Sequence, residues 1–437
     1  MPAVIEATRT MARRAVRPET PARLRLWVAV TVVTAAALLA TLSLLMARVQ
    51  EQVRIIGDEA APQAATAADL YFALSDMDAQ VARMVLTGGD DALAGTQIDA
   101  LGTYQERSRQ VDADLQKSLT TSSTAADRAA VLTLLDHLAV YRERVWQTLT
   151  AGDAAAGFYT QATNVLHLDL LPAAQALKDA SEKRLDDAYA GKKVTQVLAV
   201  TCALVLGIAL LILLLTLQVW LARRFRRVFS PALLVATVLT VLLIVPAIAV
   251  LVLQGQRLGE ARDESLSPFL ALSQARAISY DAAADTSRYL ISENLAYYDD
   301  DFKKKAACLV NGDSCEVSLP VVAGGPDVSP FDAEQVASRW QAYQKDHQKI
   351  IALAAAGKKD EAVGVLTGIR RGDAAFDFTY FDAAVGEIAD ERQADFDQAM
   401  DDTSTLLTGW AVIPLVVMGL VIVLVPVAVR KRFAEYR

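Results

Sequence analysis

Four long apolar runs constrain this chain more than any other feature of its 437 residues. They are Leu26–Met46, Val194–Leu221, Val228–Leu253 and Leu406–Val429. None contains a charged residue, and each exceeds the roughly 20 residues that an α-helix needs to cross the hydrocarbon core of a bilayer. Pro246, Pro414 and Pro426 lie within them, but membrane helices tolerate proline when neighbouring groups take up the freed carbonyl. The runs predict four transmembrane helices.

The first run lies where a cleaved secretory signal peptide would lie. Its length exceeds the apolar core of roughly 7–15 residues that is typical of such a signal. The sequence that follows it, ARVQEQVRIIGDEA (residues 47–60), continues without a turn signal. We therefore expect an uncleaved membrane anchor that runs on as a helix.

Basic residues gather in three short pieces beside the apolar runs. Residues 1–25, the link 222–227 and the tail 430–437 carry net charges of +4, +4 and +3, whereas the whole chain carries −8. The two long segments, 47–193 and 254–405, must therefore carry −19. Because short basic loops stay on the cytoplasmic side, we expect both termini and the link in the cytoplasm. The two long segments then lie outside, in a multi-pass protein of the plasma membrane.

Both long segments show the periodicity of amphipathic helices. In the first segment, one apolar stripe is formed by Leu134, Leu138, Tyr141, Val145 and Thr148. Thr124, followed three residues later by Asp127, is typical of a helix N-cap. The expected fold is an all-α membrane protein in which four transmembrane helices carry two tandem extracytoplasmic up-down helical bundles.

The two long segments repeat each other at an offset of 205 residues. Several polar positions recur at this offset: Asp76, Arg83 and Gly152 as Asp281, Arg288 and Gly357, and Asp58-Glu59 as Asp263-Glu264. We interpret the chain as a tandem duplication of a membrane helix, an outer bundle and a second membrane helix.

The repeat is interrupted over residues 301–331, which are rich in Gly and Pro and contain Cys308 and Cys315. Two cysteines outside the cytoplasm are most simply a disulfide that closes a loop. A free pair and a metal site are the alternatives. Cys202 lies inside an apolar run and is interpreted as an apolar filler.

The recurring Asp/Arg pairs, Asp76 with Arg83 and Asp281 with Arg288, are the candidate residues for binding a ligand or a partner. Seven residues of helix separate the members by about 10 Å, which is too far for a direct salt bridge or for a self-contained grip on a small amino acid. Each is expected to pair with a charge on another helix and so to fix helix register. The alternative is recognition: an arginine receives a carboxylate, and an acid from a neighbouring helix or from the second protomer of a homodimer completes the site.

No P-loop, nucleophile-elbow, zinc-protease or kinase motif occurs in the sequence. The histidines lack metal-ligand spacing, and His347, on an apolar stripe, is interpreted as a hydrogen-bonded core residue. We therefore expect no catalytic residue, no metal, no cofactor and no nucleic-acid partner. The basic link is formed by Arg223, Arg224, Arg226 and Arg227. It either contacts anionic lipid headgroups alone or docks a cytosolic partner.

Residues 57–88, GDEAAPQAATAADLYFALSDMDAQVARMVLTG, together with the duplicated layout and the missing output domain, resemble the GlnX-type membrane proteins of actinobacteria. The outer segments are also similar to the four-helix-bundle sensor domains of chemoreceptors and histidine kinases. The resemblance implies that an aspartate- or glutamate-class signal passes from a glutamine-binding-type lipoprotein to the soluble serine/threonine protein kinase G, which phosphorylates a forkhead-associated regulator of 2-oxoglutarate metabolism.

We therefore expect a membrane sensor, not an enzyme, whose partners are a solute-binding lipoprotein outside and a cytosolic Ser/Thr protein kinase inside. One alternative is an orphan receptor that binds a small molecule itself. Another is a structural or assembly protein of the cell envelope.

Overall fold

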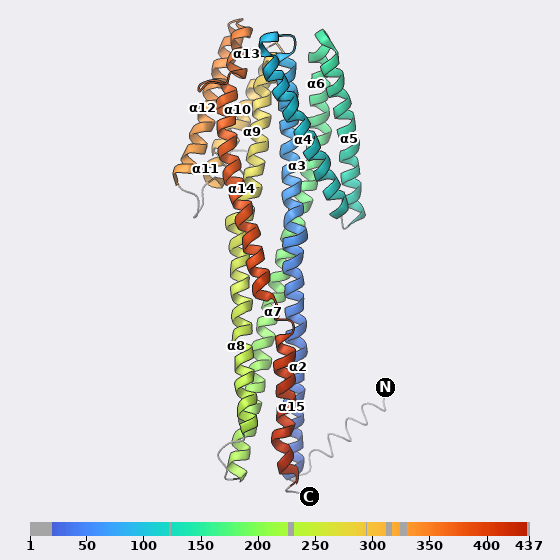
Figure 1. The fold of residues 1–437 in the computed structure, drawn as a ribbon, viewed down its shortest axis with the longest axis vertical. Helices are drawn as coiled ribbons and strands as arrows, with labels where there is room; N and C mark the ends of the chain where they lie inside the picture. The colour runs from blue at the N-terminus through green and yellow to red at the C-terminus, as the bar shows by residue number, and fades with distance from the viewer. Residues whose placement is uncertain are drawn as a thin grey trace. The chain divides into compact units, whose positions relative to one another are not determined.

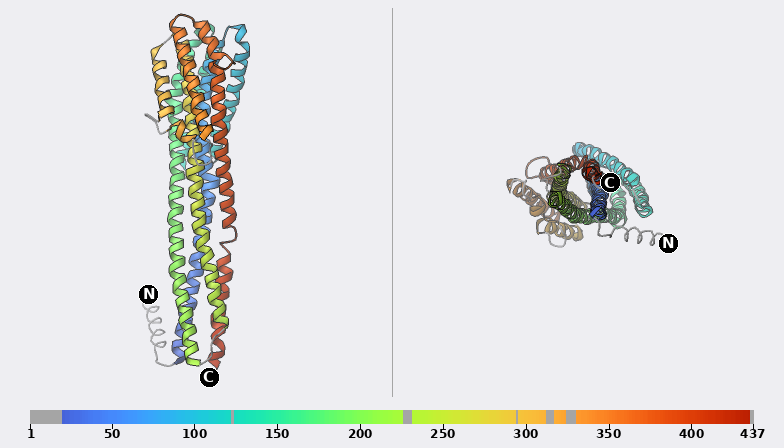
Figure 2. Two further views of the ribbon diagram at one scale, coloured as in Figure 1. Left: turned by 90° about the vertical axis from the view of Figure 1, so that its left-hand side faces the viewer. Right: turned by 90° about the horizontal axis from the view of Figure 1, so that it is seen from below.

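The computed structural model describes residues 20–121, 124–225, 231–293, 295–311, 317–323 and 330–434. These residues form helices joined by short turns, and they include no strand. Figures 1 and 2 show these helices. By their contacts they divide into two compact units. The apolar unit comprises Met1–Ile55, Ala188–Gly259 and Ala399–Arg437, and the polar unit comprises Ile56–Asp187 and Glu260–Gln398.

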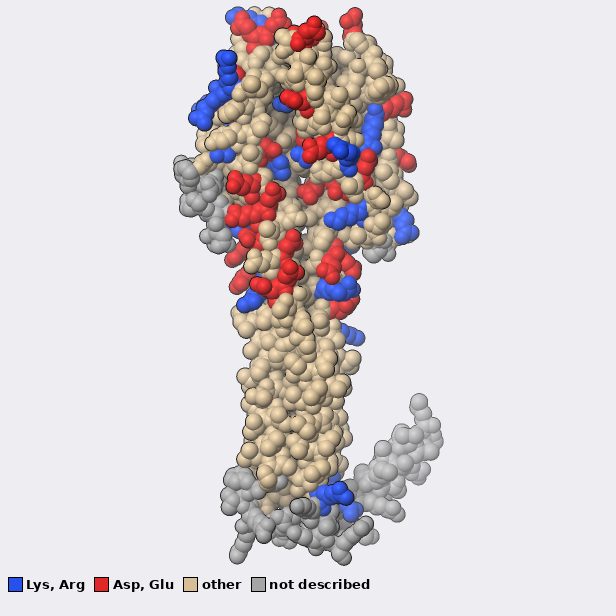
Figure 3. All heavy atoms as spheres, in the orientation of Figure 1, with Lys and Arg blue, Asp and Glu red and all other residues tan. Residues whose placement is uncertain are grey.

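The apolar unit holds four helical stretches that are long and apolar enough to cross a membrane. They lie in α2 (Thr20–Ile55), the second half of α7 (Leu171–Phe225), α8 (Pro231–Glu260) and α15 (Ile413–Ala434). α15 packs against α2. On the face that Figure 3 shows, Lys, Arg, Asp and Glu side chains are sparse on the described part of this unit and gather on the polar unit. The prediction of four candidate spans is confirmed.

Close packing and part-buried hydrogen bonds join α7 to α8. A Cβ at Gly207 would lie 2.5 Å from Ile244 Cδ1, so a larger residue there would force the Ile244 side chain to move. The side-chain amide of Gln196 donates to the carbonyl of Leu251 at 2.7 Å, and that of Gln218 to the carbonyl of Leu233 at 3.0 Å. Polar side chains within the spans are thus used between helices, as is common in membrane bundles.

The fourth span starts later than the sequence predicts. α14 (Ala374–Leu407) ends within the predicted run 406–429, a turn follows, and α15 begins at Ile413. Gly409 adopts a φ of 86°, which favours glycine. Pro414 then stands at the second position of α15, where its missing N–H costs nothing. The fourth candidate span therefore begins at Ile413, not at Leu406.

The polar unit is built from both long segments. The first contributes η1 (Ile56–Ala60), α3 (Ala61–Thr87), η2 (Asp91–Leu93), α4 (Ala94–Thr121), α5 (Ala125–Thr150), η3 (Gly152–Ala154), α6 (Ala155–Val165), η4 (Leu166–Leu170) and the start of α7. The second contributes η5 (Ala261–Leu266), α9 (Ser267–Ile291), α10 (Ala296–Asn311), α11 (Leu319–Val322), α12 (Pro330–Ala355), α13 (Lys359–Thr367) and most of α14.

The two segments meet within one unit, where α3 of the first packs along α9 of the second, and their division into two tandem bundles stays a prediction. α3 buries side chains on almost all of its faces, because small alanines alternate with its large apolar residues. A helix buried all round needs neighbours on every side, and its own segment supplies only some of them. A periodic apolar stripe predicts one buried helix face, so it could not predict that α3 also buries the face that packs against α9.

Several local predictions are confirmed. The stripe Leu134, Leu138, Tyr141, Val145 and Thr148 is buried in α5, and the Thr124 hydroxyl accepts from the Asp127 N–H at 3.1 Å. The predicted loop 301–331 is wrong over its first residues, which continue α10 to Asn311 because Phe302, Ala306 and Leu309 form a buried stripe. Cys308 is buried in α10, whereas Cys315 lies outside the described residues, so the disulfide stays a prediction.

Three π-helical turns stand just before prolines. η1, η4 and η5 each end shortly before Pro62, Pro172 and Pro268 respectively. A proline ring clashes with the carbonyl four residues earlier, and a widened turn relieves the clash without ending the helix. η1 and η5 contain the repeated Asp58-Glu59 and Asp263-Glu264, so the duplication extends to this backbone feature.

Candidate functional site

The contact between α3 and α9 is the candidate functional site, because it joins the two repeated segments and concentrates buried charge. Aromatic rings line part of it: Phe72 and Tyr280 meet edge to face with centroids 5.2 Å apart. The guanidinium of Arg276 lies 4.3 Å from the centre of the Phe72 ring. Such a contact favours a cation over the face of an aromatic ring.

Arg288 on α9 is the centre of a buried ionic cluster. Its guanidinium contacts Asp78 at 2.6 Å, Asp285 at 2.6 Å and Asp281 at 2.9 Å. The side chains of Arg288 and Asp78 are 2% and 0% exposed. Lys305 on α10 adds a second cation, at 2.6 Å from Asp281 and 2.5 Å from Asp285. Because Asp78 belongs to α3, the cluster ties the first segment to the second.

Hydroxyl groups from two further helices complete the environment of Asp78. Tyr141 on α5 donates to its carboxylate at 3.3 Å, Tyr159 on α6 at 3.1 Å and Thr163 at 3.3 Å. With Arg288, these donors satisfy a carboxylate that no water reaches. Four helices thus converge on one buried acid, and a shift of any of them would disturb these bonds.

His167, in η4, adds a titratable group to the cluster. Its Nε2 lies 3.1 Å from Asp281 Oδ1, and its Nδ1 lies 2.9 Å from the carbonyl oxygen of Thr163. Both partners are acceptors, so a ring with both nitrogens protonated satisfies both contacts. Burial opposes this charged form, but the hydrogen bond and charge of Asp281 outweigh it and raise the pKa of His167.

The predicted Asp/Arg pairs have different surroundings in the two halves. Asp76 bonds to Arg107 on α4 at 2.6 Å instead of to Arg83, as the register interpretation predicts. Arg83 pairs with no charge among the described residues, so the same expectation is wrong for Arg83. Asp281 contacts Arg288 directly, so the expectation that seven residues are too many for a salt bridge is wrong in the second half. A long arginine side chain leans toward the N-terminus of its helix and covers the distance.

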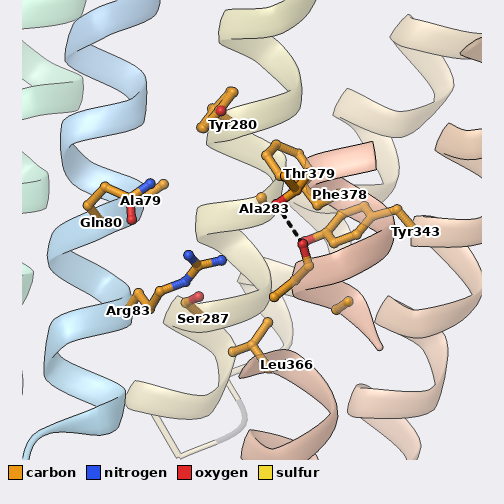
Figure 4. Close-up of a pocket in the computed structure, with 12 residues that line it drawn as sticks. Ala79, Gln80, Arg83, Tyr280, Ala283, Ser287, Tyr343, Leu366, Phe378 and Thr379 are labelled. Atoms are coloured by element: carbon orange, nitrogen blue, oxygen red, sulfur yellow. Dashed lines mark hydrogen bonds between the residues drawn. The ribbon is translucent and has the colours of Figure 1, made fainter. Parts of the chain in front are cut away.

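Arg83 borders a small pocket (Figure 4). The pocket lies between α3 of the first segment and α9, α12, α13 and α14 of the second. The pocket measures about 70 Å³ and is lined by Gln80 and Arg83 from α3, Ser287 from α9, Tyr343 from α12 and Phe378 from α14. In Figure 4 the guanidinium of Arg83 extends from α3 toward Ser287, on the side of the pocket where Tyr343 lies. Within the described part of the chain, this guanidinium has no hydrogen bond and no ion pair.

The remaining site predictions concern other parts of the chain. Arg223 is exposed at the end of α7, Arg224 also lies in α7, and Arg226 and Arg227 lie outside the described residues. Docking at the link therefore stays a prediction. Among the described residues, no group of three or more His, Cys, Asp and Glu side chains could hold a metal ion.

His347 has the core role that the sequence indicates. Its ring nitrogens lie 2.9 Å from Thr286 Oγ1 and 3.2 Å from Asp299 Oδ1, and its ring stacks on Phe302 with centroids 3.5 Å apart. Burial lowers the pKa of His347 to about 4, so the ring is neutral near pH 7.

Sequence reasoning missed most of the buried cluster, namely Asp78, His167, Asp285 and Lys305. One signal for Asp78 was present: it stands between Met77 and Val81 in a helix whose apolar positions are otherwise buried. An acid at such a position requires a partner. Nothing in the sequence indicated that the partner, Arg288, lies 210 residues away.

Asp114 on α4 is expected to make the unfolding free energy of the protein depend on pH. Burial, and then the charge of Asp69, raise the pKa of Asp114 from 3.8 to about 7. A raised folded-state pKa means that stability is present below pH 3.8 and is lost as the pH rises through about 7. Asp114→Asn, which is neutral at every pH, should therefore raise the unfolding free energy at pH 8 by about 1–2 kcal/mol, with the gain fading toward pH 4.

Thermal unfolding of the full-length protein in detergent at pH 8 and pH 4 measures this difference. Asp112→Asn is the matched control, because Asp112 is half exposed and bonds to Arg142 at 2.8 Å. The control should lose at most about 1 kcal/mol at pH 8. Equal effects of Asp114→Asn at both pH values would contradict the prediction.

Comparison with known families adds one finding. Residues 52–190 match the family model described as an actinobacterial sensor domain. This part of the chain resembles a sensor domain. The match covers roughly a third of the chain and includes α3 to α6, with Asp78, Arg83 and Tyr159. Searches of curated proteins and of solved structures found no match. The match supports a sensor protein of actinobacterial type.

Proposed function

We propose that this protein is a membrane signal transducer whose polar unit receives a signal outside the cell and whose helices pass it to a cytosolic partner. The observation that carries the proposal is the pairing of α3 with α9. Each belongs to an unbroken helical run, Leu24–Thr87 or Pro231–Ile291, that also contains a candidate span. The match of residues 52–190 to a sensor domain supports the same function.

A small shift between these two helices transmits the signal. Helix shifts of about 1–2 Å are common in switching proteins, and hydrogen-bonded charge clusters favour discrete arrangements over gradual ones. The cluster around Arg288 holds α3 and α9 in one arrangement. A signal that favours another arrangement would have to break the 2.6 Å contact between Arg288 and Asp78.

The orientation and the partners are part of the proposal. The basic link and termini favour a cytoplasmic location for these pieces, which leaves the polar unit outside. The resemblance to the GlnX-type proteins supports a solute-binding lipoprotein as the source of an aspartate- or glutamate-class signal, and a cytosolic Ser/Thr protein kinase as its receiver. The proposal requires no catalysis by this chain.

Deletion of the gene in its host, followed by quantitative phosphoproteomics after glutamate or aspartate is added to the medium, tests the proposal. We expect the wild type to show a rise in phosphorylation of the kinase substrates, the deletion strain to show none, and the wild-type gene in trans to restore it. An unchanged phosphorylation response in the deletion strain would contradict the proposal. If envelope integrity is lost at the same time, the structural alternative is favoured.

A further inference from the structure

Arg83 differs from the other arginines buried near α3 and α9. Arg107, Arg276 and Arg288 each have a carboxylate within 3 Å. The guanidinium of Arg83 is half-buried and has no such partner among the described residues. A cation that is partly removed from water without a counter-charge attracts an anion into the space beside it.

Gln80 supplies the second half of the site. It stands three residues before Arg83, so the two side chains share one face of α3. Its amide NH₂ donates to Asp76 at 2.7 Å, which fixes the orientation of the amide because a carboxylate can only accept. The side chain is 7% exposed, and its Oε1 has no donor within the described residues. A buried acceptor without a donor is unfavourable, and Gln80 borders the pocket.

The remaining walls limit the ligand in size and chemistry. Hydroxyl groups of Ser287 and Tyr343 line the pocket, and the Phe378 ring closes one side. Burial raises the pKa of Tyr343, so its hydroxyl stays protonated and can donate. A volume of about 70 Å³ admits a ligand of only a few heavy atoms. An arginine fork matches a carboxylate in bidentate geometry better than it matches a single halide ion.

We propose that this pocket binds a small carboxylate that also carries a hydrogen-bond donor, such as a short amino acid or hydroxy acid. Arg83 holds the carboxylate, and Gln80 Oε1 accepts from the ammonium or hydroxyl group. The site rests on the proposed sensor function and adds direct ligand contact to it. A bound ligand touches α3, α9, α12 and α14 together, so its arrival biases the packing that the ionic cluster also holds.

Isothermal titration calorimetry of the purified full-length protein in detergent tests the site with four probes and with phosphate as a competing anion. Glycine and glycolate carry both groups, acetate lacks the donor, and methylammonium lacks the carboxylate. We expect glycine or glycolate to bind about tenfold more tightly than acetate, and methylammonium not to bind. Arg83→Gln should weaken the binding of glycine and glycolate at least about tenfold. Arg83→Lys, which keeps the charge without the fork, should fall between Arg83→Gln and the wild type.

Arg109→Gln is the matched control, because it makes the same change at an exposed position of the polar unit, and it should leave binding unchanged. Thermal midpoints verify that the Arg83 variants are folded. The proposal is overturned if no carboxylate binds at millimolar concentration, if phosphate binds more tightly than every carboxylate, or if Arg83→Gln binds glycine and glycolate as the wild type does. A failure here, with the phosphorylation response still lost in the deletion strain, would remove the site and leave the transducer function standing.

Discussion

Arg288→Ala is expected to destabilise the polar unit by about 3–5 kcal/mol, because it leaves buried carboxylates without their counter-charge. Asp78 and Asp285 are 0% and 1% exposed and lie on two helices that the guanidinium joins. Lys305 remains near Asp285 and Asp281 but does not contact Asp78. For a unit of this size the thermal midpoint should fall by roughly 10 °C.

Tryptophan fluorescence of the full-length protein during heating in detergent measures this change. Arg262→Ala is the control, since Arg262 forms an exposed ion pair with Asp186 at 2.6 Å. Exposed pairs contribute at most about 1 kcal/mol. Equal midpoints for the two variants would show that the buried cluster does not stabilise the fold. Arg288→Met separates packing from charge, because it fills the space but still leaves Asp78 unpaired, so it should remain strongly destabilised.

Trp340→Ala should have an effect of similar size, about 3–5 kcal/mol, for a different reason. Trp340 on α12 is fully buried and packs against Phe381 and Tyr343 with ring centroids 5.1 Å and 5.4 Å away. Removing the indole leaves a large cavity among α10, α12 and α14, and a core of aromatic rings collapses poorly around such a cavity.

Chemical denaturation of the full-length protein, followed by far-UV circular dichroism, quantifies the loss. Trp146→Ala is the matched control, since Trp146 on α5 is 66% exposed and should change stability by less than about 0.5 kcal/mol. Trp340→Phe should lose less than Trp340→Ala, because the phenyl ring fills most of the space of the indole and leaves a smaller cavity. Loss of the buried indole N–H breaks no hydrogen bond with the described residues in either variant. The prediction fails if the two alanine variants are equally stable.

The sequence predicted the helices and spans because these depend on local pattern. Long apolar runs, the cap at Thr124 and the stripe of α5 each depend on residues close in the chain. The turn at Gly409 was missed because an apolar run remains apolar through a bend. The extent of α10 was missed because the cysteines and the Gly- and Pro-rich sequence after Asn311 obscured the stripe before it.

The site was predictable only in part, because its contacts are long-range. The repeat singled out Arg83 and Arg288, but it suggested that equivalent positions have equivalent surroundings. In the structure Arg288 is enclosed by carboxylates, and Arg83 faces a pocket. The difference arises because Asp285 and Lys305 have no counterpart at the offset of 205: Gln80 and Ala100 stand there instead.

A double-mutant cycle of Asp78→Ala and Arg288→Ala in the full-length protein tests the central claim, that the two repeated segments form one unit joined at α3 and α9. The two residues are 210 positions apart and contact each other at 2.6 Å. We predict a coupling energy of about 2 kcal/mol or more, with the double variant more stable than the sum of the single effects implies. Additivity within about 0.5 kcal/mol would mean that the two segments do not meet there, and would contradict the account.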